Sequence, residues 1–193
     1  DFRMIGATAV TSRHIVMAKH FPLSVNDGIS FVEPDGTWIS RNVIRVASDG
    51  STDIAVALLD SPLPSTIKPV KVVPSDFQNY FDRGTGSSIS VVNARPICVG
   101  FDHEKKALFF QVYRVGDARA IAYFDGSLVP APYDEIAEEL VGGDSGNPLF
   151  IIIDGEPVLI TSFYTTSTSP AYNSYISTIN GLIASVDSAQ GIS

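Results

Sequence analysis

A serine set between glycines is the feature of this chain with the clearest chemical potential. The motif reads Gly142-Gly143-Asp144-Ser145-Gly146-Asn147-Pro148. Glycines allow a nucleophile to sit on a tight turn that a substrate approaches closely. The backbone N–H groups of Gly143 and Ser145 are candidates for an oxyanion hole, in which two convergent donors stabilise a tetrahedral intermediate by several kcal/mol. A glycine-rich turn with an incidental serine is the competing interpretation.

A serine hydroxyl is a weak nucleophile at neutral pH and needs a neighbouring base. The chain has three histidines. His20 is the favoured base because it follows the apolar run 15–18, and a strand there would deliver it to the rim of a sheet. His14, at the start of that run, and His103, among charged residues, are interpreted as ordinary strand-end and surface histidines.

A histidine base is oriented by a carboxylate, which fixes its tautomer and stabilises the imidazolium that forms. Asp53 directly precedes the strongly apolar run 54–59, which places a carboxylate at the edge of an expected buried strand. Alone, Asp53 would be interpreted as a turn residue. Together with His20 and Ser145, it predicts nucleophilic catalysis by three cooperating side chains.

Short apolar runs separated by turn residues indicate that strands position these groups. The expected strands are Ala7–Val10, His14–Ala18, Ile29–Val32, Thr37–Ile39, Val43–Val46, Ile54–Leu58, Ile89–Asn93, Ile97–Phe101, Ala107–Val115, Ala118–Phe124, Leu149–Ile153 and Val158–Phe163. Asp-Gly turns lie at 27–28, 35–36, 49–50 and 154–155. Many short strands with frequent turns favour an all-β barrel or sandwich. No alternation of strands with long helices, typical of α/β folds, is present.

Two segments depart from the strand pattern. The acidic stretch Tyr133–Leu140 is expected to be a helical turn or a loop. The last segment, 176–186, predicts an amphipathic helix, because apolar residues recur at three- and four-residue spacings. These residues are Ile176, Ile179, Ile183 and Val186. The polar, turn-rich stretch Pro74–Ser88 is interpreted as a linker between two halves.

Composition limits the possible functions. A chain of 193 residues fits one domain, and its formal net charge of −8 argues against an extended nucleic-acid surface. No run reaches the roughly 18 apolar residues of a membrane helix. The single cysteine, Cys98, cannot form an internal disulfide and is interpreted as a buried small hydrophobe. Neither metal-ligand spacing nor a phosphate-binding glycine loop is evident, so we expect no metal and no cofactor.

The motifs taken together resemble those of trypsin- and chymotrypsin-like serine proteases. Residues 143–148 resemble their Gly-Asp-Ser-Gly-Gly-Pro, and 10–21 resemble their strand ending in Ala-Ala-His-Cys. Asp53-Ile54-Ala55-Val56 resembles their Asp-Ile-Ala-Leu element, and Gly6 falls at the glycine before the histidine strand. The motifs occur in the family order of histidine, aspartate and serine. The resemblance spans residues 6–186.

This resemblance implies an all-β, chymotrypsin-like fold of two antiparallel six-stranded β-barrels with a C-terminal helix. A single domain, 1–193, would comprise an N-terminal barrel (1–78), a C-terminal barrel (79–175) and the terminal helix (176–187). The implied activity is that of a serine endopeptidase, with the catalytic groups in the cleft between the barrels. The implied substrate is a protein or peptide, and the implied location is extracellular or otherwise exported. The oligomeric state is left open.

Further residues are assigned roles by the same resemblance. Ser162 matches a family serine that supports the catalytic aspartate and helps to align substrate as an added strand. Phe163 and Tyr164 are expected to form one wall of a substrate pocket. Glu139, six residues before the nucleophile, would favour Lys or Arg in the substrate if it lay at the pocket base. A solvated acidic loop is the favoured interpretation of Glu139.

The sequence departs from the family pattern at several positions. The flanking cysteines are missing, with Phe21 in place of one of them. Asn147 replaces a glycine, which is tolerable unless the residue has positive φ. Only 19 residues precede His20, so the first family strand is missing or shortened. Asp144 needs a hydrogen-bond donor or a cation, because an unpaired buried carboxylate is costly.

Two alternative functions remain open. A catalytically silent protease-like domain that acts as a protein-binding module would keep the same motifs. An unrelated esterase would more often place its serine in Gly-x-Ser-x-Gly, of which this chain has the first glycine, Gly143, but it would carry the histidine last in the chain. Because His20 comes first, the order of the motifs argues against the esterase.

Overall fold

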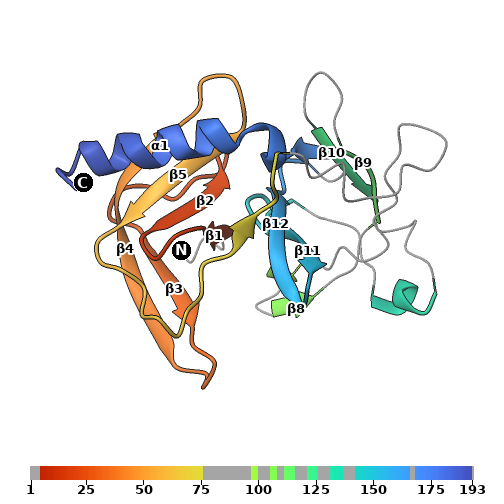
Figure 1. Ribbon diagram of the computed structural model, residues 1–193. Helices are drawn as coiled ribbons and strands as arrows, with labels where there is room; N and C mark the ends of the chain where they lie inside the picture. The colour runs from red at the N-terminus through yellow and green to blue at the C-terminus, as the bar shows by residue number, and fades with distance from the viewer. Residues whose placement is uncertain are drawn as a thin grey trace.

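The computed structural model describes residues 5–75, 97–99, 105–107, 111–115, 121–125, 131–136, 142–165 and 168–192. This part of the chain is mostly β-structure, with one α-helix near the C-terminus (Figure 1). The predictions of a mostly-β protein and of a terminal helix are therefore confirmed. Two closed six-stranded barrels are not confirmed.

The first half forms a five-stranded antiparallel sheet that curls into a half-barrel. Its strands are β1 (Ala7–Ala9), β2 (His14–Ala18), β3 (Gly28–Val32), β4 (Trp38–Ser48) and β5 (Ile54–Leu59), in the order β1-β2-β5-β4-β3. Strands β2 and β5 are buried along their whole length. They are central strands with both faces covered, which explains why their sequences are continuous apolar runs rather than alternating ones.

The two faces of this sheet support two hydrophobic cores. Side chains alternate across a strand, so odd-numbered residues of β2 and β5, such as Met17 and Ala57, point into the half-barrel. Even-numbered residues, such as Val16 and Val56, pack against the opposite side, together with β12 and the terminal helix. The sheet therefore joins the two halves of the chain through one of its faces.

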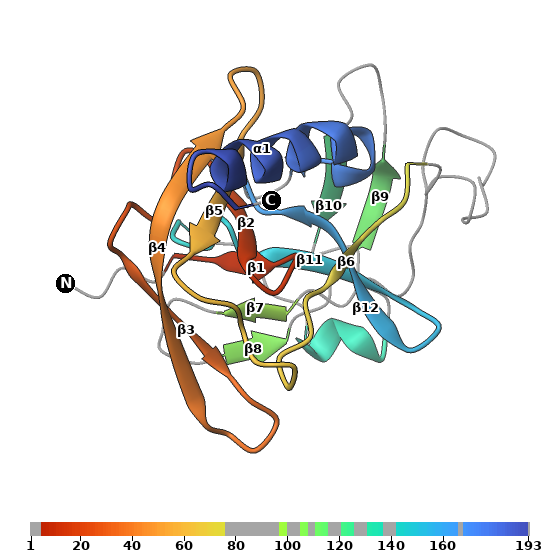
Figure 2. The same cartoon turned by 60° about the vertical axis from the view of Figure 1, so that its left-hand side comes forward.

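Helix α1 (Ile176–Ser188) lies across β5 and β4 (Figure 2). Ile179 and Val186 of its predicted apolar face are buried against the sheet, and Ile183 is partly buried there. The amphipathic pattern thus identified the correct face. No helix in the described residues is both long and apolar enough to cross a membrane.

Strand β4 is longer than expected. The sequence predicts two strands, 37–39 and 43–46, because the polar residues Ser40, Arg41 and Asn42 interrupt the apolar pattern. The structure instead has one strand with two successive partners: residues 38–42 pair with β3, and 43–48 pair with β5. The polar residues lie on the hairpin that β3 and β4 extend away from the body (Figure 2), where the side chain of Arg41 donates to the carbonyl of Pro62 and that of Asn42 donates to the carboxylate of Asp60.

No sixth strand pairs with β1 or β3 among the residues that the structure describes. The segment 61–70 contacts both of these edge strands or their ends. The N–H of Val70 donates to the carbonyl of Ala9 in β1 over 2.9 Å, and the hydroxyl of Thr66 donates to the carboxylate of Glu33, which follows β3. Leu63 and Ile67 add side chains to the core inside the half-barrel. This segment packs where a further strand would close the sheet.

The second half contains short sheets. Strands β11 (Pro148–Ile153) and β12 (Glu156–Ser162) form a hairpin that β6 (Lys71–Val72) extends in parallel. The hairpin turn has positive φ at Asp154 and Gly155, as expected for this dipeptide. The remaining elements are β7 (Ile97–Val99), β8 (Lys105–Ala107), β9 (Gln111–Val115), β10 (Ile121–Asp125), β13 (Thr168–Pro170), and the 3-10 turns η2 (Tyr133–Ile136) and η3 (Tyr172–Ser174).

Strand β10 lies between β13 and β9, and β7 pairs with β8. The expected linker, 74–88, falls outside the described residues from position 76 onward. The acidic stretch 133–140 begins with the 3-10 turn η2, so a short helical turn there is confirmed as far as the structure describes it.

Candidate active site

The turn that carries Ser145 has the tight geometry that its glycines suggest. Gly143 and Gly146 have φ values of 114° and 85°, in the region that only glycine adopts readily. The N–H of Asn147 donates to the carbonyl of Asp144 over 3.0 Å and closes the turn. Phe163 then ties the turn to the end of β12, since it accepts from the N–H of Gly146 and donates to the carbonyl of Asn147, both over 2.9 Å.

Two glycines bring this turn directly onto the first sheet. A Cβ atom on Gly6 would lie 2.6 Å from the carbonyl carbon of Gly146, too close for any side chain. A Cβ atom on Gly146 would overlap the carbonyl oxygen of Gly6 and lie 3.5 Å from the backbone nitrogen of Ala18. Ala18 is the last residue of β2, the strand that leads to His20. Backbone contacts therefore set the spacing between the nucleophile turn and the histidine strand.

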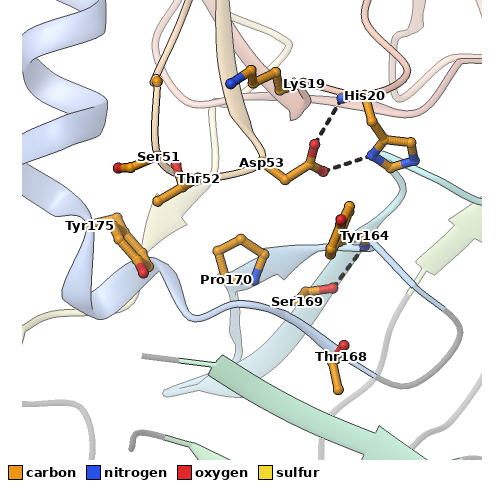
Figure 3. Close-up of a pocket in the computed structure, with 11 residues that line it drawn as sticks. Lys19, His20, Ser51, Thr52, Asp53, Tyr164, Thr168, Ser169, Pro170 and Tyr175 are labelled. Atoms are coloured by element: carbon orange, nitrogen blue, oxygen red, sulfur yellow. Dashed lines mark hydrogen bonds and ion pairs between the residues drawn. The ribbon is translucent and has the colours of Figure 1, made fainter. Parts of the chain in front are cut away.

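The antiparallel pairing of β2 with β5 brings His20 and Asp53 together. Ala18 pairs with Ile54, and the N–H of Lys19 donates to the carbonyl of Asp53 over 3.2 Å. The carboxylate of Asp53 then accepts twice from the next residue: from the backbone N–H of His20 and from its ring atom Nδ1, each over 2.8 Å (Figure 3). A carboxylate held by two N–H groups of one residue fixes that residue's ring firmly.

The other ring nitrogen of His20 faces the serine. Nε2 lies 2.8 Å from the Oγ atom of Ser145. A carboxylate only accepts hydrogen bonds, so Nδ1 carries the proton that it shares with Asp53, and Nε2 is left to accept from the hydroxyl. Ser145, His20 and Asp53 thus form one continuous hydrogen-bonded chain. The arrangement can take a proton from the hydroxyl and stabilise the resulting imidazolium.

The two candidate oxyanion donors are available. Neither Gly143 nor Ser145 donates its backbone N–H to any group in the part of the chain that the structure describes. The positive φ of Gly143 would be strained for any other residue. Within the described residues, both N–H groups are therefore open to a ligand at the serine.

The structure shows both the backbone conformation of Asn147 and a contact of its side chain with Asp144. It does not have positive φ, so the replacement of glycine causes no backbone strain. Its side-chain amide donates to the carboxylate of Asp144 over 3.5 Å, and both side chains are buried. Asn147 is therefore one partner of the buried carboxylate. An Asn three residues after an Asp within a turn is the sequence feature that could have indicated this contact.

Two of the predicted substrate-binding residues, Ser162 and Phe163, are buried. Ser162 does not hydrogen-bond to Asp53; its buried hydroxyl has no hydrogen-bond partner among the described residues. Ser162 pairs with Pro148 in the β11–β12 ladder, so its position is set by that ladder and not by the histidine site. Phe163 is fully buried and anchors the nucleophile turn. Neither observation tests whether Ser162 or Phe163 contacts a bound substrate, so their substrate-binding roles stay predictions.

Tyr164 occupies the position beside the histidine. Its ring meets the ring of His20 edge-to-face, with centroids 5.1 Å apart and an angle of 70° between the planes. Such aromatic pairs are worth about 0.5–1.5 kcal/mol beyond the area they bury. The side chain is still half exposed. Tyr164 therefore holds one side of the imidazole while it remains open to a ligand.

Tyr172 was not expected at the site. Burial raises the pKa of its hydroxyl well above the usual range, and the charge of Asp53 raises it further. The hydroxyl is consequently protonated at any physiological pH. Tyr172 contributes its ring to the core between the sheet and the helix, behind the site.

A cavity of about 710 Å³ opens on the aspartate side of His20 (Figure 3). Its walls are the β4–β5 loop (50–53), strand β13 and the rings of Tyr164 and Tyr175. No residue of the nucleophile turn, 142–147, lines it. The cavity thus borders the site without containing the serine.

The remaining candidates lie elsewhere. His14 is buried at the start of β2, and its Nε2 atom lies 3.0 Å from the carboxylate of Asp187 in α1. Glu139 and His103 fall outside the described residues, and Cys98 belongs to β7. No group of three metal-ligating side chains occurs in the described ranges.

Comparison with known proteins adds no relative. No protein-family model matches the chain, and no curated protein matches it in sequence. What the site does must therefore be inferred from its own geometry.

Proposed function

We propose that this protein is a serine endopeptidase in which Ser145 is the nucleophile, His20 the general base and Asp53 the orienting carboxylate. One observation carries the proposal: the imidazole of His20 lies 2.8 Å from the serine Oγ on one side and 2.8 Å from the aspartate carboxylate on the other. These are the contacts that general-base activation of a hydroxyl requires.

The proposed reaction proceeds through an acyl-enzyme. The Oγ atom of Ser145 attacks the carbonyl carbon of a peptide bond while Nε2 of His20 takes the hydroxyl proton. The tetrahedral intermediate collapses, the C–N bond breaks, and the imidazolium returns the proton to the leaving amine. Water then attacks the ester carbonyl, again giving a proton to Nε2, and the carboxylic acid product leaves with the serine hydroxyl restored.

The charge that develops on the carbonyl oxygen needs donors. The unpaired N–H groups of Gly143 and Ser145 fit this role, since each such donor contributes about 3–4 kcal/mol of transition-state stabilisation in well-characterised hydrolases. Asp53 stabilises the imidazolium without becoming protonated.

We further propose that the architecture is chymotrypsin-like, with the site between two β units. Two features support this: His20 and Asp53 come from adjacent strands of the half-barrel, and Ser145 comes from the turn that precedes β11. The packing of segment 61–70 against β1 and beyond β3 would replace the first strand of the family pattern.

A fluorophosphonate probe tests the proposal directly, because it reacts only with an activated serine. We expect the wild-type protein to be labelled on Ser145, and the Ser145→Ala and His20→Ala variants to remain unlabelled while folding normally. Cleavage of a peptide library by wild type and by Ser145→Ala extends the test from reactivity to peptide hydrolysis. A folded wild-type protein that is neither labelled nor active would instead favour a protein-binding module.

A further inference from the structure

Part of the wall of the cavity beside His20 is made of rings. Tyr164 and Tyr175 supply two phenol rings, and Pro170 supplies a third apolar surface between them (Figure 3). Flat apolar walls favour apolar and aromatic ligands, which gain both by leaving water and by ring–ring contact. At about 710 Å³, the cavity has room for a large side chain.

The carboxylate of Asp53, which lines the cavity, is already engaged, because its two oxygens accept from the backbone and ring N–H groups of His20. A basic side chain entering the cavity would lose its hydration without gaining a free carboxylate, which is costly. The ammonium group of Lys19 donates to the backbone carbonyl of Asp49 over 2.7 Å and keeps two further donors.

Three hydroxyl groups of the wall are also used internally, whereas the hydroxyl of Thr52 has no hydrogen-bond partner among the described residues. Ser51 donates its hydroxyl to the carboxylate of Asp49 over 2.7 Å. Ser169 accepts from the backbone N–H of Tyr164 over 2.9 Å, and the Thr168 hydroxyl bonds to that of Thr165 over 2.8 Å. These contacts shape the wall and leave the rings as the surface offered to a ligand.

The cavity is close to the scissile bond but separate from it. His20 belongs to both places: its Nε2 atom faces Ser145, and its ring lines the cavity. An extended peptide advances about 3.3 Å per residue. A residue one to three positions from the scissile bond can therefore reach the cavity.

We propose that this cavity binds an uncharged, large apolar or aromatic side chain of the peptide substrate, one to three residues from the bond that is cleaved. The proposal rests on the proposed function and names its substrate preference. Tyr164 and Tyr175 are the residues that would determine this preference, and the nucleophile turn plays no part in it.

A peptide library that varies three positions on each side of the scissile bond tests the proposal on the wild-type protein. At one of these positions, peptides with Phe, Tyr or Leu should have at least tenfold higher kcat/KM than peptides with Lys, Arg, Asp or Glu. A flat profile at all six positions, or a preference for a charged residue at the position that cavity variants affect, would overturn the proposal.

Gly50 offers a way to fill the cavity. It lines the cavity, and a Cβ atom there would meet nothing within 4 Å. Gly50→Phe should reduce kcat/KM for the aromatic peptide at least tenfold, while a peptide with Gly at the same position is cleaved as by wild type. The matched control is Gly28→Phe on the exposed hairpin, where a Cβ atom has only Asn42 Oδ1 at 4.0 Å. It should leave the profile unchanged.

Gly50→Glu supplies a gain of function that misfolding cannot mimic. A carboxylate at this position should raise the relative kcat/KM for Lys or Arg at the affected position at least fivefold. Unchanged profiles for both Gly50 variants, in protein that is folded and labelled by fluorophosphonate, would overturn the cavity proposal and leave the peptidase intact. Failure of wild-type labelling would overturn the peptidase, and with it the cavity proposal.

Discussion

Strand β2 carries a histidine near each end, and each histidine is paired with a distant aspartate. His14 begins the strand and bonds through Nε2 to Asp187 of helix α1 at 3.0 Å. His20 follows the strand and bonds through Nδ1 to Asp53 at 2.8 Å. The side chain of His14 is 8% exposed, and that of His20 is 38% exposed.

The difference lies in the second ring nitrogen. At His14 it bonds to the hydroxyl of Thr11, three residues earlier in the same chain segment, at 2.7 Å. At His20 it bonds to Ser145, which lies 125 residues later on a turn with two positive-φ glycines. A histidine–aspartate pair is therefore a structural clamp when local groups and burial complete it. It becomes a candidate site when a presented hydroxyl and an open cavity complete it.

The largest expected effect is a difference in catalytic activity between variants of the two histidines. His20→Ala and Ser145→Ala should each reduce kcat for peptide hydrolysis by about 10⁴-fold or more, since members of such a unit act together. His14→Gln should leave kcat per folded molecule within twofold of wild type. Active-site titration with a fluorophosphonate, which counts competent molecules, provides the normalisation. Equal losses of kcat in the His14 and His20 variants would show that the two histidines do not differ in their contribution to activity.

Gly6→Ala should give the next largest effect. The added methyl group displaces the nucleophile turn from the histidine strand, and a shift near 1 Å at a reacting centre costs about 10²-fold in rate. The expected result is a fall of about 10²-fold in kcat, with KM changed much less. Gly181→Ala is the control: it lies in α1 with nothing within 4 Å of a Cβ atom, and it should not reduce activity. Normal activity of Gly6→Ala would show that the backbone contact does not set the spacing.

The clamp at His14 should affect stability instead of rate. His14→Ala and Asp187→Ala each leave the partner of the pair without its hydrogen bond, and an unpaired buried polar group costs about 1–3 kcal/mol. Urea unfolding of both single variants and of the double variant measures this cost and the coupling between the two groups. Additive effects would mean that the 3.0 Å contact contributes nothing as a pair.

The smallest expected effect concerns the loop that carries Asp53. Hydrogen bonds from Ser51 lower the pKa of Asp49 to about 2 from an ordinary value of 3.8. The charged form is thus favoured in the folded state, so its contribution is complete above pH 3.8 and is lost as the pH falls through 2. Solvent exposure keeps it below about 1 kcal/mol. The difference in unfolding free energy between wild type and Asp49→Asn should accordingly be present at pH 6 and absent near pH 2.

Much of the site was predictable because its signals are local. His20, Ser145 and Asp53 each lie at a junction between an apolar run and a turn, and their order along the chain limited how they could meet. The buried runs of β2 and β5 and the helical face of Ile179 and Val186 follow directly from apolar periodicity.

The rest depends on contacts between segments that no local pattern records. Ser162 pairs with Pro148 at the end of β12, and Tyr164, two residues later, packs against the ring of His20. The bond from Asn147 to Asp144 depends on how the turn folds. The long β4 arises because two neighbours pair with it in succession. In each case the tertiary partner, and not the residue's own propensity, determined the outcome.

The close backbone contacts among Gly6, Gly146 and Ala18 also affect when the site can form during translation of the chain. A ribosome delivers His20 and Asp53 first, and the serine emerges 125 residues after the histidine. Until the turn around Ser145 has been translated and packs against Gly6, the nascent chain contains the histidine without the serine that it would activate. On the proposed function, an unfinished chain is inert, and the cell that makes the protein encounters a peptidase only once translation has passed the nucleophile and both halves have assembled.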